Sequence, residues 1–291
     1  MAIRLRSLGD CVLTTPALHL LKSYRPDIRL GVMVEERFAG VFTGNPDVDS
    51  ILPPAFSAAW RFRPDLTINL HGGARSAWLT LATSARKRAG FAHYRYLPWI
   101  YNVRFPRAQQ ILGCERKVHT AEHVASAVFY LGVPQSEVPR SRLFTTKGSP
   151  VGGNYAVLHP FASAVSKAWP ASRFVAVARH LETQHRLTVV ILGGPGDDVT
   201  PFQSFRVLSN APLEEVKAVL AGASIFVGND SGPAHMAAAF GIPVVVLFGS
   251  SDPVVWAPWK TQAETIVAAE GLASVKVASV IAAADRLRVA P

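Results

Sequence analysis

Short apolar runs rich in β-branched residues alternate with helix-forming segments along the whole chain of 291 residues. In the first half, strands are predicted at residues 3–6, 28–34 and 66–70, and helices at 10–24, 36–42, 74–84 and 119–131. In the second half, strands are predicted at residues 155–159, 187–192, 205–208, 224–227 and 243–248, and helices at 170–184, 212–220, 236–240 and 272–288. This alternation is typical of α/β proteins, in which a doubly wound parallel sheet carries helices on both faces.

A stretch of glycine, serine and proline at residues 147–153 separates the two halves, as is typical of a linker. We therefore predict two Rossmann-like domains, at residues 1–150 and 151–291, that face a cleft. Ligands in such sheets bind outside the carboxyl ends of the strands, so the first loop of each half should point into that cleft. The last helix, at about residues 272–288, is expected either to pack back on the first domain or to be an ordinary terminal helix.

The net charge of +10 lies entirely in the first half. Residues 1–150 carry 20 Lys and Arg against 10 Asp and Glu, whereas residues 151–291 carry 10 of each. A basic first domain favours an anionic partner, such as a phosphorylated lipid surface or a nucleic acid. The alternative explanation of this charge is that the excess arginines lie on an ordinary soluble surface.

Basic and aromatic residues are interleaved between residues 86 and 117 without a clear period, and we predict a long functional loop there. The interleaved basic residues are Arg86, Lys87, Arg88, Arg95, Arg104 and Arg107, and the aromatic ones are Phe91, Tyr94, Tyr96, Trp99, Tyr101 and Phe105. Such a mixture suits either stacking on single-stranded nucleic acid or holding phosphorylated head groups at a membrane interface.

Several classes of protein are excluded by what the sequence lacks. No apolar run approaches the roughly 18 residues of a membrane span, and no apolar segment of a secretory signal follows the first residues, so we expect a cytoplasmic protein. Cys11 and Cys114 are too few for a disulfide framework or a cysteine-built metal site. Because His71, His119 and His123 are scattered, we predict no metal site.

The segment Gly228–His235 places small, acidic and imidazole groups between a predicted strand and a predicted helix. Asp230 or Ser231 can cap that helix, whose free N–H groups and positive dipole end would then face an anion. A plain helix cap without a ligand is the alternative.

Two other loops that follow predicted strands carry reactive groups. Asp10 follows the first strand and is a candidate general base, with a helix N-cap as its structural alternative. Lys167 lies in the loop between His159 and Pro170, together with hydroxyl groups that include Ser163. Its ammonium is placed to neutralise a diphosphate, and a solvated surface charge is the alternative reading.

These motifs together resemble the ADP-heptose:lipopolysaccharide heptosyltransferase family, glycosyltransferase family 9. The matching segments, in chain order, are Ser7-Leu8-Gly9-Asp10, Thr15-Pro16-Ala17-Leu18, His159-Pro160 through Lys167-Ala168-Trp169-Pro170, Leu192-Gly193-Gly194-Pro195, and Asp230-Ser231-Gly232-Pro233-Ala234-His235. The resemblance implies a GT-B fold with an N-terminal acceptor domain and a C-terminal nucleotide-sugar domain. It also implies an inverting glycosyl transfer that needs no metal and no cofactor.

The resemblance also implies roles for particular residues. The family's base falls on Asp10 and its phosphate-binding lysine on Lys167. The expected donor-binding residues are Ser163, Lys167, Gly193, Gly194, Asp198, Asp230, Ser231, Gly232 and His235. The expected acceptor-binding residues are Arg6, His71, Arg75 and Arg88. Phe161 stands where the family commonly has a glycine, and we expect it to alter the loop before Lys167.

The implied reaction moves a heptose or a similar sugar from an ADP-sugar, the donor substrate, to an inner-core lipopolysaccharide-type acceptor. That anionic glycolipid fits the basic first half, and we expect peripheral contact with the cytoplasmic face of the inner membrane, no nucleic acid partner and a monomer. Two alternatives stay open from the sequence. One is a GT-B sugar-nucleotide epimerase, and the other is a non-catalytic protein that binds a nucleotide sugar or a nucleic acid.

Overall fold

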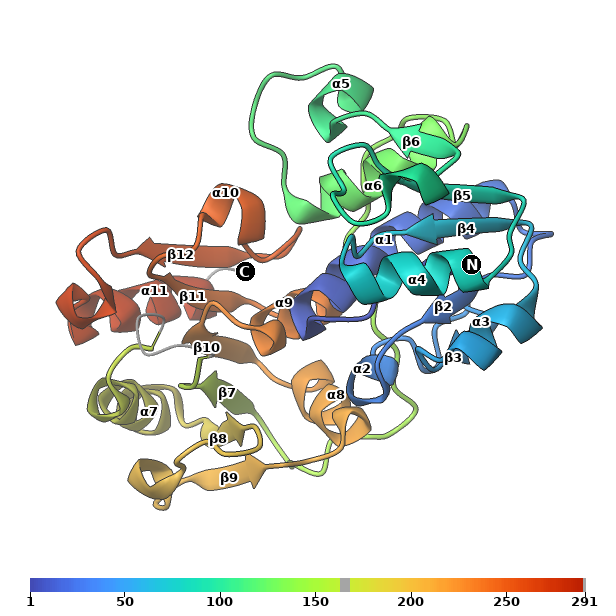
Figure 1. Ribbon diagram of the computed structural model, residues 1–291. Coiled ribbons are helices and arrows are strands. Elements are labelled where there is room, and N and C mark those ends of the chain that lie inside the picture. The colour runs from blue at the N-terminus through green and yellow to red at the C-terminus, as the bar shows by residue number, and fades with distance from the viewer. Residues whose placement is uncertain (163–167, 290–291) are drawn as a thin grey trace. The chain divides into compact units, whose positions relative to one another are not determined.

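The computed structural model describes residues 1–162 and 168–289, and the chain divides into two compact units, Met1–Phe144 and Thr145–Pro291. Each unit contains one six-stranded parallel sheet with helices on both of its faces (Figure 1). The predicted class, α/β with two Rossmann-like doubly wound sheets, is therefore confirmed. The boundary between the units falls a few residues before the predicted one at residue 150.

The first sheet has the strand order β3-β2-β1-β4-β5-β6. Its strands are β1 (Ala2–Ile3), β2 (Gly31–Met33), β3 (Ser50–Leu52), β4 (Leu66–Asn69), β5 (Lys87–Phe91) and β6 (Val103–Phe105). In the register of the sheet, Ile3 lies between Met33 of β2 and Asn69 of β4. The first strand is therefore only two residues long, and it lies in the middle of the sheet.

Helices cover both faces of the first sheet. They are α1 (Leu8–Tyr24), α2 (Glu36–Ala39), α3 (Phe56–Phe62), α4 (Ala74–Ala82), α5 (Ala108–Leu112) and α6 (Thr120–Tyr130). Since right-handed crossovers from β1 to β2 and from β4 to β5 run in opposite directions, α1 and α4 must lie on opposite faces. Figure 1 shows this arrangement, with α6 packed beside α1 and α3 beside α4.

A proline in the middle of α1 is accommodated locally. Pro16 has no N–H for the carbonyl of Val12, one turn earlier, and a helix interior normally suffers from that loss. The hydroxyl of the preceding residue, Thr15, donates to the Val12 carbonyl at 2.8 Å. The freed carbonyl is therefore satisfied and α1 continues to Tyr24.

The prediction of a long irregular loop at residues 86–117 is wrong. The segment contains β5, β6, α5 and the 3-10 turn η1 (Pro98–Ile100). Phe91, Tyr101 and Phe105 are buried in the core, and the side chains of Arg88 and Arg104 donate to backbone carbonyls. The short strands β5 and β6 lie towards the edge of the sheet, where Lys87, Arg88 and Arg104 interrupt the apolar pattern that would have marked these strands.

The second sheet has the order β12-β11-β10-β7-β8-β9. Its strands are β7 (Tyr155–His159), β8 (Thr188–Gly193), β9 (Arg206–Ser209), β10 (Ile225–Asn229), β11 (Val244–Phe248) and β12 (Ala263–Val267). Numbered within its own unit, this is the order 3-2-1-4-5-6, the same as in the first sheet. The patterns in the sequence do not predict β3, α3, β12 or the short helix α10 (Pro253–Trp256).

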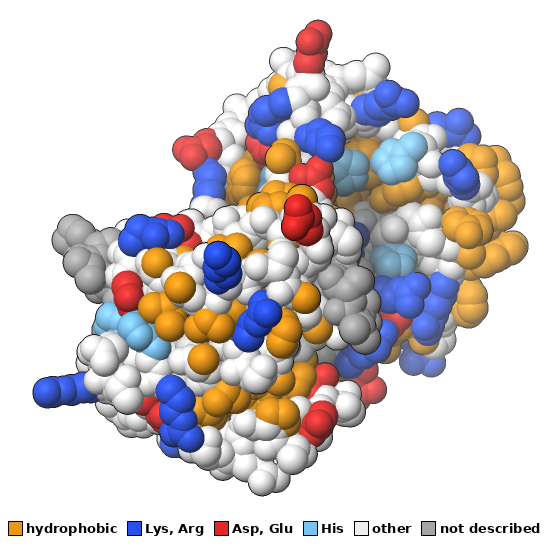
Figure 2. All heavy atoms as spheres, turned by 90° about the vertical axis from the view of Figure 1, so that its left-hand side faces the viewer, with side chains coloured by type: hydrophobic (Ala, Val, Ile, Leu, Met, Phe, Trp, Pro, Cys, Tyr) orange, Lys and Arg blue, Asp and Glu red, His pale blue; other side chains and the backbone are white. Residues whose placement is uncertain are grey.

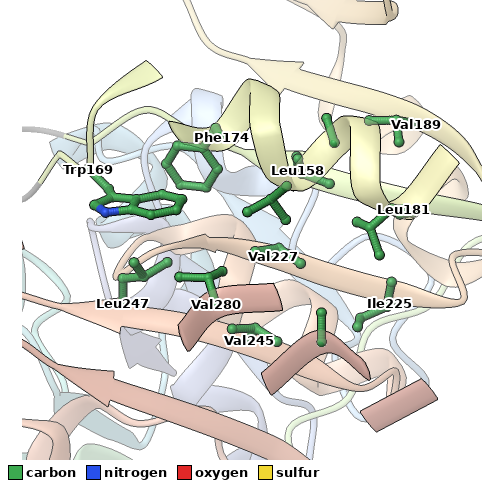
Figure 3. Close-up of a cluster of buried hydrophobic side chains, with 14 of the residues drawn as sticks. Leu158, Trp169, Phe174, Leu181, Val189, Ile225, Val227, Val245, Leu247 and Val280 are labelled. Carbon is green, nitrogen blue, oxygen red and sulfur yellow. The ribbon is translucent and has the colours of Figure 1, made fainter. Parts of the chain in front are cut away.

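The remaining helices of the second unit are α7 (Ala171–His185), α8 (Leu213–Ala221), α9 (Gly232–Phe240) and α11 (Val277–Val289). Helices α7 and α11 cover one face of the sheet, and α8 packs beside α9. Figure 3 shows the core under the first pair, where Leu158, Val227 and Val245 come from three neighbouring strands and Val280 comes from α11. These side chains are completely shielded from solvent.

The last helix begins later than predicted, at Val277, after the separate 3-10 turn η4 (Leu272–Ser274). Its inward residues Val280, Ala283 and Ala284 belong to the core of the second unit. Packing of this helix on the first unit stays a prediction. No helix in the described part of the chain is long and apolar enough to cross a membrane.

Candidate active site

Each sheet has one point at which the winding reverses. In the first sheet it lies between β1 and β4, and in the second between β7 and β10. The helices that follow such a pair of strands go to opposite faces, so the two loops part and leave a crevice at the carboxyl edge, where ligands bind. In the first unit, Asp10 lies in the first turn of the helix that follows one of these loops, and His71 lies in the other loop. In the second unit, the two loops carry the segment after His159 and Asp230.

Asp10 is held from two sides in the first turn of α1. Its Oδ2 accepts hydrogen bonds from the Ser7 N–H at 3.2 Å and from the Ser7 hydroxyl at 3.0 Å. Its Oδ1 lies 3.3 Å from Nη2 of Arg4. Ser7 rather than Asp10 is therefore the N-cap, and Asp10 keeps a partly exposed carboxylate, with 22% of its side chain accessible.

Arg4 is a site residue that the sequence reasoning missed. It is buried, and its Nε donates to the hydroxyl of Thr14 at 3.1 Å while its Nη2 faces Asp10. A buried arginine requires such partners, because an unpaired charge in the interior is costly. The only signal in the sequence was an arginine within the first apolar run, Ile3-Arg4-Leu5.

His71 shares the surroundings of Asp10. Burial lowers the pKa of His71, and the positive charges of Arg4 and Arg6 lower it further. The imidazole is therefore neutral at neutral pH and can donate or accept a hydrogen bond. The structure thus brings together three predicted residues of the first unit: Asp10, His71 and the exposed Arg6.

The other two predicted acceptor residues lie differently. Arg75 is exposed in the first turn of α4, and its Nη2 donates to the Pro54 carbonyl at 3.0 Å. Arg88 lies near the amino end of β5, and it donates to the carbonyls of Ile100 and Ala85, both at 2.8 Å. Arg88 therefore supports the backbone away from the carboxyl edge, and the structure does not bring it to Asp10.

In the second unit, α9 begins directly at the carboxyl edge. Ser231 is its N-cap, Gly232 its first residue, and Asp230 connects β10 to it. The hydroxyl of Ser231 is buried and has no hydrogen-bond partner among residues 1–162 and 168–289. A buried hydroxyl beside the free N–H groups of a helix N-terminus is suited to an anionic ligand. His235, one turn further on, is buried, with its ring centroid 6.5 Å from that of Trp256.

Ser163 and Lys167 lie outside the described residues, whereas the residues that flank this segment, Pro160 and Trp169, lie within them. Asn229, at the end of β10, donates from Nδ2 to the Pro160 carbonyl at 2.8 Å. Its Oδ1 accepts the N–H of Trp169 at 3.1 Å. This completely buried amide therefore joins both ends of the loop across the winding-reversal point. The motif that contains Asn229 is recognisable in the sequence, but its bridging role is not.

Gly193 and Gly194 lie at the end of β8. A Cβ at Gly193 would meet Val199 at 3.1 Å and Phe161 at 3.3 Å, so any larger residue there would force these side chains to shift by a few tenths of an ångström. The N–H of Gly194 donates to Oδ2 of Asp197 at 2.7 Å. The predicted Asp198 is exposed and accepts from the Thr200 N–H at 3.0 Å.

A cavity of about 690 Å³ opens at this same edge of the second sheet. Its walls include the rings of Phe161, Phe202 and Trp169, and Asp197 and Leu272 also line it. Phe161 and Phe202 meet edge to face, with ring centroids 6.0 Å apart. The substituted residue Phe161 is thus part of an apolar wall, and Asp197 rather than Asp198 is the carboxylate at the cavity.

Two doubly wound units with the same strand order are what the GT-B fold requires, and here one carries an anion-suited helix N-terminus and the other a partly exposed carboxylate. The model of glycosyltransferase family 9 (heptosyltransferase) matches residues 61–281, and the chain belongs to this family. Family membership decides between the alternatives left open by the sequence: the protein is a glycosyltransferase, not an epimerase or a non-catalytic binding protein.

Individual relatives agree with this assignment. Lipopolysaccharide heptosyltransferase 3 of Escherichia coli K12 is 26% identical over 285 residues, which cover 86% of this chain and 82% of the relative. A family 9 glycosyltransferase of Veillonella parvula has the same fold, with a TM-score of 0.86, 21% identity and coverage of 99% and 96% of the two chains. E. coli heptosyltransferase WaaC, solved with ADP, follows with a TM-score of 0.81, 21% identity and 98% coverage of each chain.

Proposed function

We propose that this protein transfers a heptose, or a similar sugar, from an ADP-sugar to an anionic inner-core lipopolysaccharide-type glycolipid, with inversion at the anomeric carbon. The observation that carries the proposal is the setting of Asp10, a partly exposed carboxylate fixed by Arg4 and Ser7 at the winding-reversal point of the first sheet. Membership of the heptosyltransferase family and a structural relative solved with ADP support the donor.

In the proposed reaction, Asp10 takes the proton of an acceptor hydroxyl as that oxygen attacks the anomeric carbon. The bond between the anomeric carbon and the diphosphate oxygen breaks at the same time, and the nucleoside diphosphate leaves. Inversion follows because the attacking oxygen approaches opposite to the leaving group. Arg4 and Ser7 keep the carboxylate oriented, and the neutral His71 is available to hold the acceptor by a hydrogen bond.

The donor would be held by the second unit. The N-terminus of α9 and the Ser231 hydroxyl offer hydrogen-bond donors to the diphosphate, and Lys167 supplies a positive charge in the proposed role. These groups can stabilise the charge that grows on the leaving diphosphate, so the proposed transfer needs no metal. The cavity beside Phe161 and Phe202 suits a flat apolar group such as the adenine base.

The acceptor side of the proposal includes contact with a membrane surface. Phe56 and Trp60 on α3, Trp78 on α4 and Trp99 on η1 are all at least half exposed, and α4 packs beside both α3 and η1. The guanidinium of Arg63 lies over the Trp60 ring at 5.3 Å. Aromatic side chains next to arginines favour the interface of an anionic membrane, where a glycolipid acceptor resides.

Asp10→Asn tests the reaction directly. We expect kcat for transfer from ADP-heptose to a lipopolysaccharide acceptor to fall by about 10²–10⁴-fold, because general-base catalysis is lost. Binding of the donor, measured by calorimetry or thermal shift against ADP-, GDP- and UDP-sugars, should persist with a preference for the ADP-sugar. Asp27→Asn, which changes an exposed carboxylate paired with Arg25, is the matched control. Unchanged transfer by Asp10→Asn would refute the base assignment, and stabilisation by no nucleotide sugar would refute the donor.

A further inference from the structure

Two histidines and one aspartate meet at the surface of the second unit, where α7 ends against α11. The Nε2 atoms of His180 and His185 lie 2.8 Å and 2.7 Å from the same oxygen, Oδ1 of Asp285. All three potential ligand atoms lie within 4.8 Å of one another. Figure 2 shows histidine and acidic side chains close together at its left.

The chemistry of this set matches a transition-metal ion. Two imidazole nitrogens and one carboxylate oxygen are ligands that Zn²⁺ prefers, with water in the fourth tetrahedral position. Zinc ligands at about 2.0–2.1 Å from the ion are separated by roughly 3.3 Å, so each imidazole nitrogen needs to move away from Oδ1 of Asp285 by only about half an ångström. The side chains are between 20% and 39% exposed, which leaves solvent access for the ion and for its water.

Two of the positive charges next to this cluster are neutralised by carboxylates. Arg286, beside Asp285, makes a two-pronged ion pair with Glu264, with N–O distances of 3.0 Å and 2.9 Å. Arg179, beside His180, is paired with Glu182 at 3.2 Å. These two guanidinium groups are thus engaged with carboxylates, and Arg186, which follows His185, is exposed to solvent.

From this geometry we propose that His180, His185 and Asp285 form a Zn²⁺-class metal site that ties the end of α7 to α11. Helix α7 starts at the carboxyl edge of the sheet and ends at His185, just before β8 begins, so the site lies about 20 Å from the donor loops. The metal therefore has a structural role and takes no part in the transfer. It fastens the helix whose Val280 and Ala283 complete the core.

Calorimetric titration of the metal-free, full-length protein with ZnSO₄ tests the site. We expect one tight Zn²⁺ per chain, a rise in Tm of about 5 °C at saturation, and no comparable effect of MgCl₂, since Mg²⁺ prefers oxygen ligands. Co²⁺ in the same site should give the visible absorption of a tetrahedral complex with nitrogen and oxygen ligands.

His180→Gln and His185→Gln should each weaken Zn²⁺ binding at least tenfold, whereas transfer activity should stay that of the native protein. His93→Gln, an exposed histidine of the first unit, is the matched control and should bind Zn²⁺ like the native protein. Circular dichroism establishes that each variant is folded. Absence of stoichiometric binding at about 100 µM Zn²⁺, or unchanged binding by both cluster variants, would overturn the proposal.

Discussion

Arg4 and Asp10 form a partly buried ion pair, with Nη2 of the arginine 3.3 Å from Oδ1 of the aspartate. Only 8% of the Arg4 side chain is exposed, against 22% for Asp10. The arginine thus reaches the carboxylate from the protein side and leaves the other side open to a substrate. This asymmetry makes Arg4 a positioning residue for the proposed base.

Replacing Arg4 should therefore affect transfer without changing donor binding. Arg4→Met is expected to lower kcat by about tenfold or more, and to cost about 1–3 kcal/mol of unfolding free energy, since the Thr14 hydroxyl loses its donor. Arg4→Lys should retain part of kcat and part of the unfolding free energy. Lysine keeps the positive charge, but it cannot contact Thr14 and Asp10 at the same time as the guanidinium does. Steady-state kinetics and urea unfolding measure the two effects. Arg37→Met, at an exposed ion pair, serves as control, and equal kcat in Arg4→Met and the native protein would contradict the positioning role.

Asn229 should control the donor loop. Asn229→Ala removes the bridge between Pro160 and Trp169, so we expect KM for the ADP-sugar to rise about tenfold or more. Because two buried backbone groups lose their partners, stability should fall by about 2–4 kcal/mol. Asn102→Ala is a matched control, since Asn102 also bonds two backbone groups but lies in the first unit. If both variants raised the donor KM equally, the bridge would have no specific part in donor binding.

Replacing Ser231 should change binding of the donor without lowering the stability of the protein. Its buried hydroxyl makes no cap hydrogen bond and has no partner in the described part of the chain, so Ser231→Ala should leave Tm unchanged or raise it slightly. The same change should weaken ADP-sugar binding by about tenfold, because a donor to the diphosphate is lost. Ser126→Ala, which removes a hydroxyl bonded to the His123 carbonyl, should show no binding defect. Tight donor binding by Ser231→Ala would exclude the hydroxyl from the site.

His123 should make stability depend on pH. Burial lowers its pKa to about 4, with smaller contributions from the charges of His93 and Arg4, and its ring stacks on Phe91 with centroids 4.2 Å apart. In the unfolded state, the imidazole of His123 has a pKa near 6.5, so it binds a proton at pH values where the folded state does not. The contribution of His123 to the free energy of unfolding is therefore fully present above about pH 6.5. It is lost as the pH falls towards 4, and this loss amounts to about 3 kcal/mol at most. Urea unfolding at pH 7.5 and pH 5 should show a smaller loss in His123→Phe, and an equal loss would assign the effect to other groups.

The exposed aromatic side chains should govern membrane binding. We expect the double variant Trp60→Ser/Trp78→Ser to bind anionic lipid vesicles about tenfold more weakly than the native protein in a sedimentation assay. Binding by the native protein should fall with added salt and should be weak for zwitterionic vesicles. Tyr130→Ser changes an exposed aromatic residue of α6, on the other face of the first sheet, and should bind like the native protein. Equal loss in both variants would show that no particular face docks.

Local patterns in the sequence were sufficient to predict much of the fold. The spacing of apolar residues predicts β7 and β11 and most long helices. Apolar side chains recur at different spacings in strands and in helices, and this difference can be recognised within a short stretch of sequence. The order of motifs likewise places Asp10 and the Asp230–His235 segment after strands. The same reasoning failed at residues 86–117, where short strands near a sheet edge carry too few residues to show a period.

What the chain determined by itself is thus the sequence of elements and the loops that carry the reactive groups. The tertiary structure alone decided that β1 pairs with β4 and β7 with β10, which selects the two loops of each unit that share a crevice. It also decided that Asn229 reaches Pro160, 69 residues earlier in the chain. Contacts of this kind depend on how strands pair and helices pack across the whole unit, and no local spacing of residues encodes them.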